Sequence, residues 1–398
     1  MAHFFLKRPC AICNSTNSRL LFQQSFSNLS NNGSLLSGYD VVVCEQCGFC
    51  FADNIPDQIF FDSYYRDMSK YEKAGNSGQD TPYDQARFQT MAKIILGFLT
   101  SPKLRIFEIG CANGQLLALL KQNGYENVSG IDPSPISAQI ANEQYGIDVS
   151  AHTISDLPAN TQNVDFLILA GVVEHVKELS PALQRMRKLL SDNGLIFITV
   201  PDASRYPEGE DAPFQEFSVE HINFFGPVSL ESFLDANGFT KIATVQDMIE
   251  SNYRTRTPVV HALFKKSEFP AQSSLPRDNQ TEVSLKTYIE QSVLADHLVQ
   301  ASINKVVEAG NPIVIWGTGA HTLRLLETSQ LGKANIRAFV DSNPRYQGKS
   351  LNAIPIISPS ELKNVPEPIL ISSRVYQEEI AKQIRVELKL NNDLIKLY

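Results

Sequence analysis

The stretch that decides the fold is IFEIGCANG, residues 106–114. Its apolar start reads as a buried strand that ends near the acid Glu108, and Gly110 and Gly114 then open a helix. The spacing differs from the G-x-G-x-x-G turn of dinucleotide-binding sheets. Small residues at these positions allow the backbone to approach a ligand closely. The stretch therefore predicts a strand, a ligand-binding turn and a helix within an α/β sheet.

Strand and helix patterns alternate downstream of this turn. Apolar runs of strand length are separated by runs with helical spacing that stop at a glycine, which is the rhythm of a doubly wound sheet. The pattern predicts an α/β domain over residues 59–265 that begins with a helical bridge, 59–100. The predicted strands are 103–109, 127–132, 164–172, 195–201 and 259–266, and the predicted helices are 115–124, 181–194 and 229–239.

The glycine turn resembles the E/D-x-G-x-G-x-G loop of class I methyltransferases, with Ala112 in the middle glycine position. Asp132 stands where an acid in that family binds the ribose hydroxyls of S-adenosylmethionine (SAM). The segments ISDLP (154–158) and LAGVVEHV (169–176) resemble the adenine contact and the end of the fourth strand. A nucleotide site of another kind is the alternative. The resemblance implies these SAM contacts: Glu108, Gly110, Cys111, Ala112, Gly114, Asp132, Ser155, Asp156, Ala170 and Gly171.

Five of the six cysteines lie in the first fifty residues. Cys10 and Cys13 form one C-x-x-C pair, and Cys44 and Cys47 form another. Four thiolates of this spacing suit tetrahedral Zn²⁺ and leave no open position, so the pattern predicts a structural zinc domain over residues 1–58. The alternatives are free thiols, Cys50 as a replacement ligand, or a ribbon that binds nucleic acid.

Composition limits the class of protein. At 398 residues the chain needs more than one domain, and 43% hydrophobic with 20% charged residues is typical of a soluble globular protein. A net charge of −8 argues against nucleic acid as the main partner. No apolar run is long enough for a membrane span, and no signal peptide is apparent, so we expect a cytoplasmic protein with a small-molecule substrate.

The C-terminal part reads as a second α/β domain. Residues 266–281 are polar with two prolines and predict a linker, and 282–398 begin with one long helix. VIWGTGAHT, with Gly317 and Gly319, predicts a strand and a glycine turn into a helix. Such a turn can present N–H groups to a diphosphate. A place for the substrate's nucleotide, a second nucleotide cofactor and a purely structural lid all remain open.

The order of these elements resembles one family across nearly the whole chain, the NDP-hexose (keto-deoxysugar) 3-C-methyltransferases. That family has an N-terminal four-cysteine zinc domain, a central SAM domain and a C-terminal Rossmann-like domain. The resemblance implies a base that removes a proton beside the sugar's keto group, after which the enolate attacks the methyl donor. The positions that match its catalytic residues are His221, Glu220, His175 and, more weakly, Tyr71.

The stretch SVEHINFF, residues 218–225, carries the expected base. A histidine can accept a proton near neutral pH and return it, whereas adjacent strand residues point to opposite faces. We therefore expect a bend that lets Glu220 and His221 serve one site. The family often has a tyrosine where Ser218 stands, and another where Phe224 and Phe225 stand, so hydroxyls for the sugar or the enolate are missing here.

The C-terminal turn also departs from the family. A lysine is usual where His321 stands, so His321 or Arg374 is expected to supply a positive charge for the substrate's nucleotide. His152, His261 and His297 are interpreted as structural or exposed. Alternative functions are O- or N-methylation of another small acceptor, a non-catalytic nucleotide-sugar binding protein, and RNA methylation. The acceptor, the methylated carbon and the oligomeric state stay open.

Overall fold

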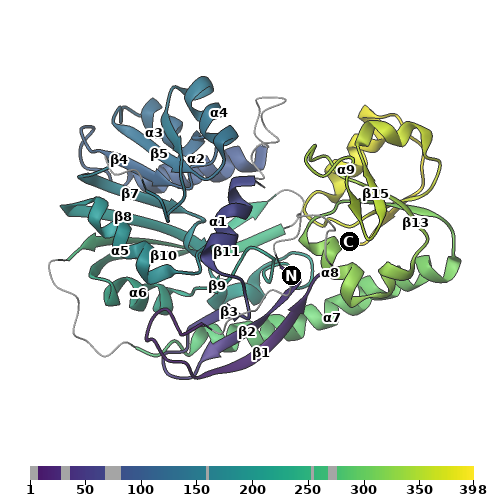
Figure 1. The fold of residues 1–398 in the computed structure, drawn as a ribbon, viewed down its shortest axis with the longest axis horizontal. Coiled ribbons are helices and arrows are strands. Elements are labelled where there is room, and N and C mark those ends of the chain that lie inside the picture. Colours follow the sequence, from purple (N-terminus) through teal and green to yellow (C-terminus); the bar gives the residue numbers. More distant parts are fainter. Residues whose placement is uncertain (1–7, 28–35, 68–81, 158–160, 252–254, 268–275) are drawn as a thin grey trace.

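The computed structural model describes residues 8–27, 36–67, 82–157, 161–251, 255–267 and 276–398. These ranges contain three sheets, of four, seven and six strands. Figure 1 shows the seven-stranded sheet in one lobe, the six-stranded sheet in a second lobe, and the four-stranded sheet below the first. The long helix α7 (Gln280–Ala309) runs from the four-stranded sheet to the second lobe.

The seven-stranded sheet has the order β10-β11-β8-β7-β4-β5-β6. Strands β4 to β8 run parallel, and β11 is antiparallel to both β8 and β10. This is the predicted α/β fold with a doubly wound sheet. The order reverses at β4, and ligands of such sheets bind beyond the carboxyl ends of the strands at the reversal. The strands are β4 (Ile106–Ile109), β5 (Val128–Asp132), β6 (Asp148–Ala151), β7 (Val164–Ala170), β8 (Leu190–Pro201), β10 (Phe239–Ser251) and β11 (Thr255–Lys266).

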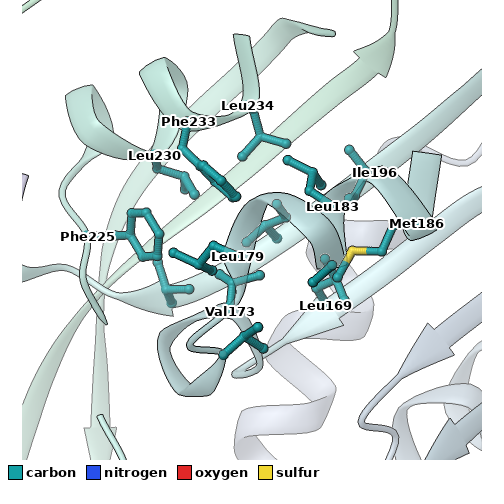
Figure 2. Packing of buried hydrophobic residues seen from close by; sticks show 14 of the residues in the cluster. Leu169, Val173, Leu179, Leu183, Met186, Ile196, Phe225, Leu230, Phe233 and Leu234 are labelled. Atoms are coloured by element: carbon teal, nitrogen blue, oxygen red, sulfur yellow. The ribbon is translucent and has the colours of Figure 1, made fainter. Parts of the chain in front are cut away.

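Helices cover both faces of this sheet. On one face, Leu117 belongs to the same buried cluster as Phe166. On the other, Leu183 and Phe233 pack with Leu169, as Figure 2 shows. Both faces of the sheet centre are therefore shielded from water, which explains why the central strands β7 and β8 contain long runs of buried apolar residues. The first set of helices is α2 (Pro82–Leu96), α3 (Gln115–Gln122) and α4 (Pro135–Tyr145), and the second is α5 (Leu179–Leu189) and α6 (Pro227–Ala236).

One predicted helix is shorter than the sequence pattern indicates. The pattern extends it to Gly194, but α5 ends at Leu189. Leu190 is buried and already pairs with Val164, so β8 begins there. Burial of Leu190 in the sheet therefore prevails over the glycine stop signal.

The four-stranded sheet is antiparallel and joins distant parts of the chain. Its order is β1-β2-β3-β9, and β3 pairs with β9 through Phe51 and Asn223. The sequence predicts residues 1–58 as a separate unit, and β9, which comes from the methyltransferase-like region, lies outside that range. Because β9 begins two residues after His221, the N-terminal sheet reaches the expected catalytic stretch. The strands are β1 (Ser18–Ser25), β2 (Gly38–Cys44), β3 (Cys50–Asp53) and β9 (Asn223–Phe224).

The six-stranded sheet has the order β14-β15-β13-β12-β16-β17 and is parallel except for β14. Its strands are β12 (Ile313–Trp316), β13 (Ile336–Val340), β14 (Ser350–Leu351), β15 (Ile354–Ile357), β16 (Ile369–Ile371) and β17 (Leu394–Lys396). Further helices are α1 (Gln58–Asp67), α8 (Ala320–Thr328) and α9 (Gln377–Lys382), with short turns at Val173–His175, Ala203–Glu208, Gln330–Lys333, Pro359–Asn364 and Gln383–Glu387.

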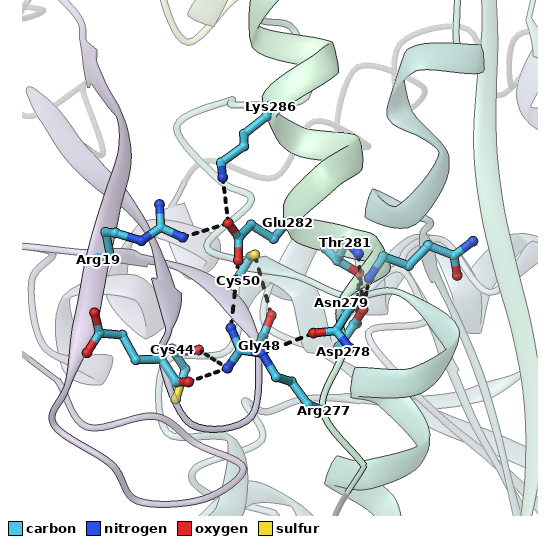
Figure 3. A network of polar contacts seen from close by, with 12 residues as sticks. Arg19, Cys44, Gly48, Cys50, Arg277, Asp278, Asn279, Thr281, Glu282 and Lys286 are labelled. Atoms are coloured by element: carbon cyan, nitrogen blue, oxygen red, sulfur yellow. Dashed lines mark hydrogen bonds and ion pairs between the residues drawn. The ribbon is translucent and has the colours of Figure 1, made fainter.

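The start of α7 is fastened to the N-terminal sheet, as Figure 3 shows. Arg277 donates to the carbonyl of Glu45, and the Asp278 N–H donates to the carbonyl of Cys47 at 2.8 Å. Glu282 pairs with Arg19 at 2.6 Å. The helix begins at Gln280, two residues before the predicted start at residue 282, because the Asp278 carboxylate accepts the first backbone N–H groups. Among the described residues, no helix combines the length and the hydropathy needed to cross a bilayer.

Candidate active site

The glycine turn after β4 is shaped by close packing. Gly110 and Gly114 have φ of 73° and 77°, and a Cβ on Gly114 would lie 2.9 Å from the Cβ of Ala141 in α4. Ala112 also adopts the left-handed region, with φ of 48°, where the resembled loop has glycine. The turn therefore keeps the backbone path of the glycine loop although its middle residue has a side chain.

Two carboxylates lie behind this turn. Asp132 ends β5, and its Oδ2 accepts the N–H of Ala112 at 2.8 Å. This hydrogen bond links β5 to the glycine turn. Glu108 is 2% exposed, and its Oε2 has no hydrogen-bond partner in the part of the chain that the structure describes. Burial, and then the charge of Asp132, raises the pKa of Glu108 to about 8. A site with these two acids suits a ligand that carries hydroxyls and positive charge.

A pocket of about 970 Å³, including its open mouth, lies over the carboxyl ends of β4, β5, β6 and β7. Four of the predicted donor contacts line it: Gly110, Asp132, Ala170 and Gly171. The complete lining is Gln58, Asp62, Tyr65, Ile109, Gly110, Asp132, Pro133, His152, Thr153, Ile154, Ala170, Gly171, Val172, His175, Val176 and Glu220.

The other predicted donor contacts lie elsewhere. Glu108, Cys111 and Ala112 are buried behind the pocket wall. Gly114, Ser155 and Asp156 are also absent from its lining, and Asp156 instead accepts hydrogen bonds from the backbone and hydroxyl of Thr153. Thr153 and Ile154 line the pocket instead, and Ile154 belongs to the predicted adenine segment 154–158.

Sequence reasoning missed the contribution of helix α1. Gln58, Asp62 and Tyr65 line the pocket, at positions i, i+4 and i+7 of one helical face. That spacing of polar and aromatic residues was the available signal. His152, interpreted from the sequence as structural or exposed, lines the pocket as well, with its Nδ1 3.1 Å from the hydroxyl of Ser150.

Two predicted catalytic histidines come together at the edge of the pocket. The ring centroids of His175 and His221 are 5.1 Å apart. His175 lines the pocket, whereas His221 stands next to it outside the lining. The Nδ1 of His175 lies 3.0 Å from the carbonyl of Glu220, and because a carbonyl only accepts, Nδ1 carries the hydrogen and Nε2 is the basic atom. Glu174, His175 and His221 bring their polar atoms within 4.8 Å of one another.

The expected bend is present at SVEHINFF. The Ser218 hydroxyl accepts the N–H groups of Glu220 and His221 at 3.3 and 3.2 Å, which closes a tight turn. Serine at the position of a family tyrosine therefore has a local structural role. Glu220 turns its side chain into the pocket lining, where its carboxylate accepts the hydroxyl of Tyr64 at 3.2 Å.

Two tyrosines of α1 stand beside the histidines. Tyr65 packs edge-on against His175, with ring centroids 5.6 Å apart. Burial, and then the charge of Glu220, hold the pKa of both Tyr64 and Tyr65 above the ordinary tyrosine range, so both phenols are neutral donors. Tyr71, the predicted catalytic tyrosine, lies outside the described residues.

The turn with His221 is held from several sides. Asn223 is 2% exposed and donates to the carbonyls of Val173 and Val176 at 2.8 and 2.7 Å. Its side-chain oxygen accepts from Arg8 at 2.9 Å, and Arg8 also donates to the carbonyl of Ile222 at 2.7 Å. The segment that follows His221 is therefore fixed relative to the turn that carries His175.

The four predicted zinc ligands meet in one cluster. The Sγ atoms of Cys10, Cys13, Cys44 and Cys47 lie within 4.8 Å of one another, with Cys10 and Cys47 at 3.4 Å and Cys13 and Cys44 at 3.5 Å. A tetrahedral zinc with Zn–S bonds of about 2.3 Å requires sulfur separations of roughly 3.8 Å, so the cluster fits the ion. Cys50 lies apart, at the start of β3, with its thiol toward the carbonyl of Gly48.

The C-terminal glycine turn repeats the geometry of the first. The N–H of Thr318, between Gly317 and Gly319, donates to Asp341 Oδ2 at 3.0 Å, as Ala112 donates to Asp132. Gly317 has φ of 110°, and a Cβ on it would meet the hydroxyl of Ser372 at 3.0 Å. The turn is therefore a second strand–turn–helix unit of the same kind.

The expected charge at His321 is corrected by the structure. Its ring bonds to the hydroxyl of Tyr398, and burial, followed by the nearby Arg324, lowers the pKa of His321 to about 3. The imidazole is thus neutral at pH 7 and supplies no positive charge. Arg374 donates to the carbonyl of Asp211 at 2.8 Å, so it ties the C-terminal lobe to the loop that precedes Glu220.

Glu216 in this loop gives a prediction for stability. Burial, and then Asp211, raises its pKa to about 8 from 4.5, so ionisation opposes folding increasingly between pH 4.5 and 8. We expect Glu216→Gln to unfold with wild-type free energy at pH 4.5 and to be more stable by about 1–4 kcal/mol at pH 8. Urea denaturation at both pH values measures this.

The matched control is Glu282→Gln. Hydrogen bonds from Lys286, followed by those from Arg19, lower the pKa of Glu282, so its contribution is present above the unfolded pKa and is lost in acid. This variant should be less stable than the wild type at pH 8. An equal stability difference for Glu216→Gln at both pH values would contradict the prediction.

Known proteins resemble two parts of the chain. A family model described as "Methyltransferase domain" matches residues 83–244, and one described as "C2185-like, N-terminal" matches 310–395. An uncharacterized methyltransferase of Staphylococcus carnosus is 30% identical over 194 residues, which are 48% of this chain and 88% of that protein. The ubiquinone/menaquinone biosynthesis C-methyltransferase UbiE of Campylobacter jejuni is 22% identical over 162 residues, 38% of this chain and 67% of its own.

A solved structure of the Burkholderia thailandensis 1,6-didemethyltoxoflavin-N1-methyltransferase aligns with a TM-score of 0.42 and 16% identity, over 61% of this chain and all of that one. The match to the Staphylococcus protein covers most of that protein at an identity that indicates common descent. The family model spans β4 to β7, and the pocket lies at the carboxyl ends of these strands. The chain therefore belongs to the methyltransferase family, and it is a SAM-dependent methyltransferase.

Proposed function

We propose that the protein transfers a methyl group to the carbon beside the keto group of a nucleotide-linked 4-keto-deoxysugar. The observation that carries this proposal is the pair of imidazoles at 5.1 Å beside the donor pocket, next to the carboxylate of Glu220. Removal of a proton from carbon needs a base held in contact, and this pair supplies one. We assign the proton acceptor to His221.

The donor would be held at the carboxyl ends of the parallel strands. Asp132 would accept hydrogen bonds from the ribose hydroxyls. Ala170 has only a methyl side chain and Gly171 has none, so both leave room for the donor. The pKa of Glu108 is raised to about 8, and the positive charge of bound SAM would favour its ionised form. SAM supplies an already activated methyl group when it is bound.

The residues around the histidines have distinct tasks in this proposal. His221 takes the proton from the carbon next to the ketone. His175 keeps its Nδ1–H on the carbonyl of Glu220 and places Nε2 near that proton. Glu220, held by Tyr64, would accept a sugar hydroxyl. The pocket lining of Val172, Val176 and Ile109 excludes water from the reacting carbon.

The second lobe would bind the nucleotide part of the acceptor. Its turn at Gly317 and Gly319 can offer N–H groups to phosphate oxygens, and Arg374 is the cation left for that role after the correction of His321. The four N-terminal cysteines would hold a structural zinc ion, because all four positions of a tetrahedron are filled by thiolates.

Proton exchange without the donor tests the proposed function. We expect the protein, incubated in D₂O with a nucleoside-diphosphate 4-keto-deoxysugar, to exchange the hydrogen on the carbon beside the ketone. The loss of that proton's NMR signal measures the rate. An enzyme that methylates an oxygen or a nitrogen has no reason to exchange this hydrogen, so its retention would refute the proposal.

Asp132 gives a prediction for donor binding. Asp132→Ala removes the proposed ribose contact and the acceptor for the Ala112 N–H, so we expect SAM affinity to fall at least about tenfold. Asp341→Ala removes the equivalent acceptor in the second lobe and should leave SAM affinity unchanged. Calorimetric titration with SAM measures both. Equal losses in the two variants would contradict the assignment.

A further inference from the structure

The hydroxyl of Tyr65 is buried without a hydrogen-bond partner in the described part of the chain. An unsatisfied buried hydroxyl costs about 1–3 kcal/mol of folding free energy, and native proteins keep few of them. The neighbouring Tyr64 is different, because its hydroxyl donates to Glu220 at 3.2 Å. Of these two adjacent tyrosines, Tyr64 already donates its hydroxyl hydrogen, whereas the hydroxyl of Tyr65 is available to donate to a ligand.

The surroundings of Tyr65 place it in the active site. It lines the pocket together with Gly171 and Glu220, and its ring packs on His175 at 5.6 Å. Burial raises the pKa of the Tyr65 hydroxyl, and the charges of Glu220, Tyr64 and Glu174 raise it further. Carboxylates repel a phenolate, so the hydroxyl keeps its hydrogen and remains a neutral donor.

The proposed reaction requires such a donor. When the proton leaves carbon, negative charge develops on the keto oxygen, and a hydrogen bond aimed at that oxygen lowers the barrier. Glu174 and Glu220 cannot donate as carboxylates, and His221 is occupied with the proton from carbon. Ser218 and Phe224 stand where the resembled family has tyrosines, and Ser218 is engaged in its own turn.

We propose that Tyr65 is a catalytic residue that donates its hydroxyl hydrogen bond to the acceptor's keto oxygen. This inference rests on the proposed function. The carbon–hydrogen bond breaks, its proton moves to His221, and the electron pair forms the enolate that the bond from Tyr65 stabilises. The phenol O–H does not break, so the tyrosine ends the step unchanged.

Tyr65→Phe removes the single atom in question. We expect its proton-exchange rate and kcat to fall about 10²- to 10³-fold, the loss typical of one oxyanion donor, while SAM affinity stays within about twofold. Its stability to urea should equal or exceed that of the wild type, because the hydroxyl has no hydrogen-bond partner among the residues that the structure describes. A structural tyrosine would not combine a loss of rate with retained or increased stability.

Two variants serve as controls. Tyr125→Phe removes a hydroxyl that donates to the carbonyl of Leu99, away from the pocket, and should retain wild-type exchange. Tyr64→Phe should lose stability, since it breaks the bond to Glu220.

Exchange by Tyr65→Phe at the wild-type rate would overturn this inference and leave the proposed function intact. A loss of exchange accompanied by a loss of stability or of SAM affinity would also overturn it. Absence of exchange in the wild-type enzyme would refute the proposed function, and the assignment of Tyr65 with it.

Discussion

His221→Gln is expected to bind SAM with wild-type affinity and to lose methyl transfer, with kcat lower by about 10²- to 10⁴-fold. The affinity should persist because His221 does not line the donor pocket. The rate should fall because the proton on carbon then loses its assigned acceptor, and His175 Nε2 is the basic atom that remains nearby. Exchange in D₂O should fall by the same factor, since both reactions share the step that removes the proton.

A comparison with His175→Gln distinguishes which of the two histidines is the base. His175 lines the pocket, so its replacement is expected to affect SAM affinity as well as rate. His297→Gln is the matched control, because that residue is exposed on α7 and should leave both unchanged. If His221→Gln exchanges the proton at the wild-type rate while His175→Gln does not, the base is His175 and our assignment to His221 is wrong.

Local patterns were sufficient to predict much of the fold. The run from Ile106 to Gly114 has the strand and the glycine turn in the predicted places, and Asp132 ends the next strand as expected. These features are set by periodicity and by the backbone freedom of glycine, which are properties of a few consecutive residues. The bend at Ser218 was also predicted, because Glu220 and His221 could not otherwise share a site.

Contacts between distant segments were not predictable in this way. Nothing local to Asn223 shows that its strand pairs with Phe51 or that its amide spans two carbonyls. The neutral state of His321 depends on the burial created by Tyr398 and Arg324, which only the folded chain provides. The face of α1 with Tyr65 was missed because its direction is set by packing against His175.

Loss of the proposed zinc ion is the second change for which we expect a large effect. The N-terminal sheet should transmit this effect to His221, because the sheet contacts the residues on both sides of it. Gln24 of β1 donates to the carbonyl of Phe217 at 2.8 Å, and Tyr39 of β2 donates to that of Ser218 at 2.9 Å. On the other side of His221, Ala52 of β3 donates to the carbonyl of Ile222 at 2.9 Å. The sheet therefore holds the turn that carries His221 both before and after the histidine.

The cysteine cluster holds that sheet in turn. Cys44 ends β2, Cys47 and the next two residues lead into β3, and Cys10 follows Arg8, which donates to Asn223. Structural zinc contributes about 10–16 kcal/mol in small zinc domains, comparable to the whole stability of a typical domain. Without the ion, the N-terminal sheet and the turn with His221 should lose their fixed positions together.

Cys13→Ser is therefore expected to bind less than a tenth of the zinc of the wild type, to unfold at lower temperature and to exchange the substrate proton at least about tenfold more slowly. Metal analysis, thermal denaturation and exchange in D₂O measure the three effects. Cys50→Ala is the matched control, because its thiol lies outside the cluster and its zinc content should remain at one ion per chain. A Cys13→Ser protein without zinc that still exchanges the proton at the wild-type rate would contradict the coupling, since the turn at His221 would then stand without the sheet.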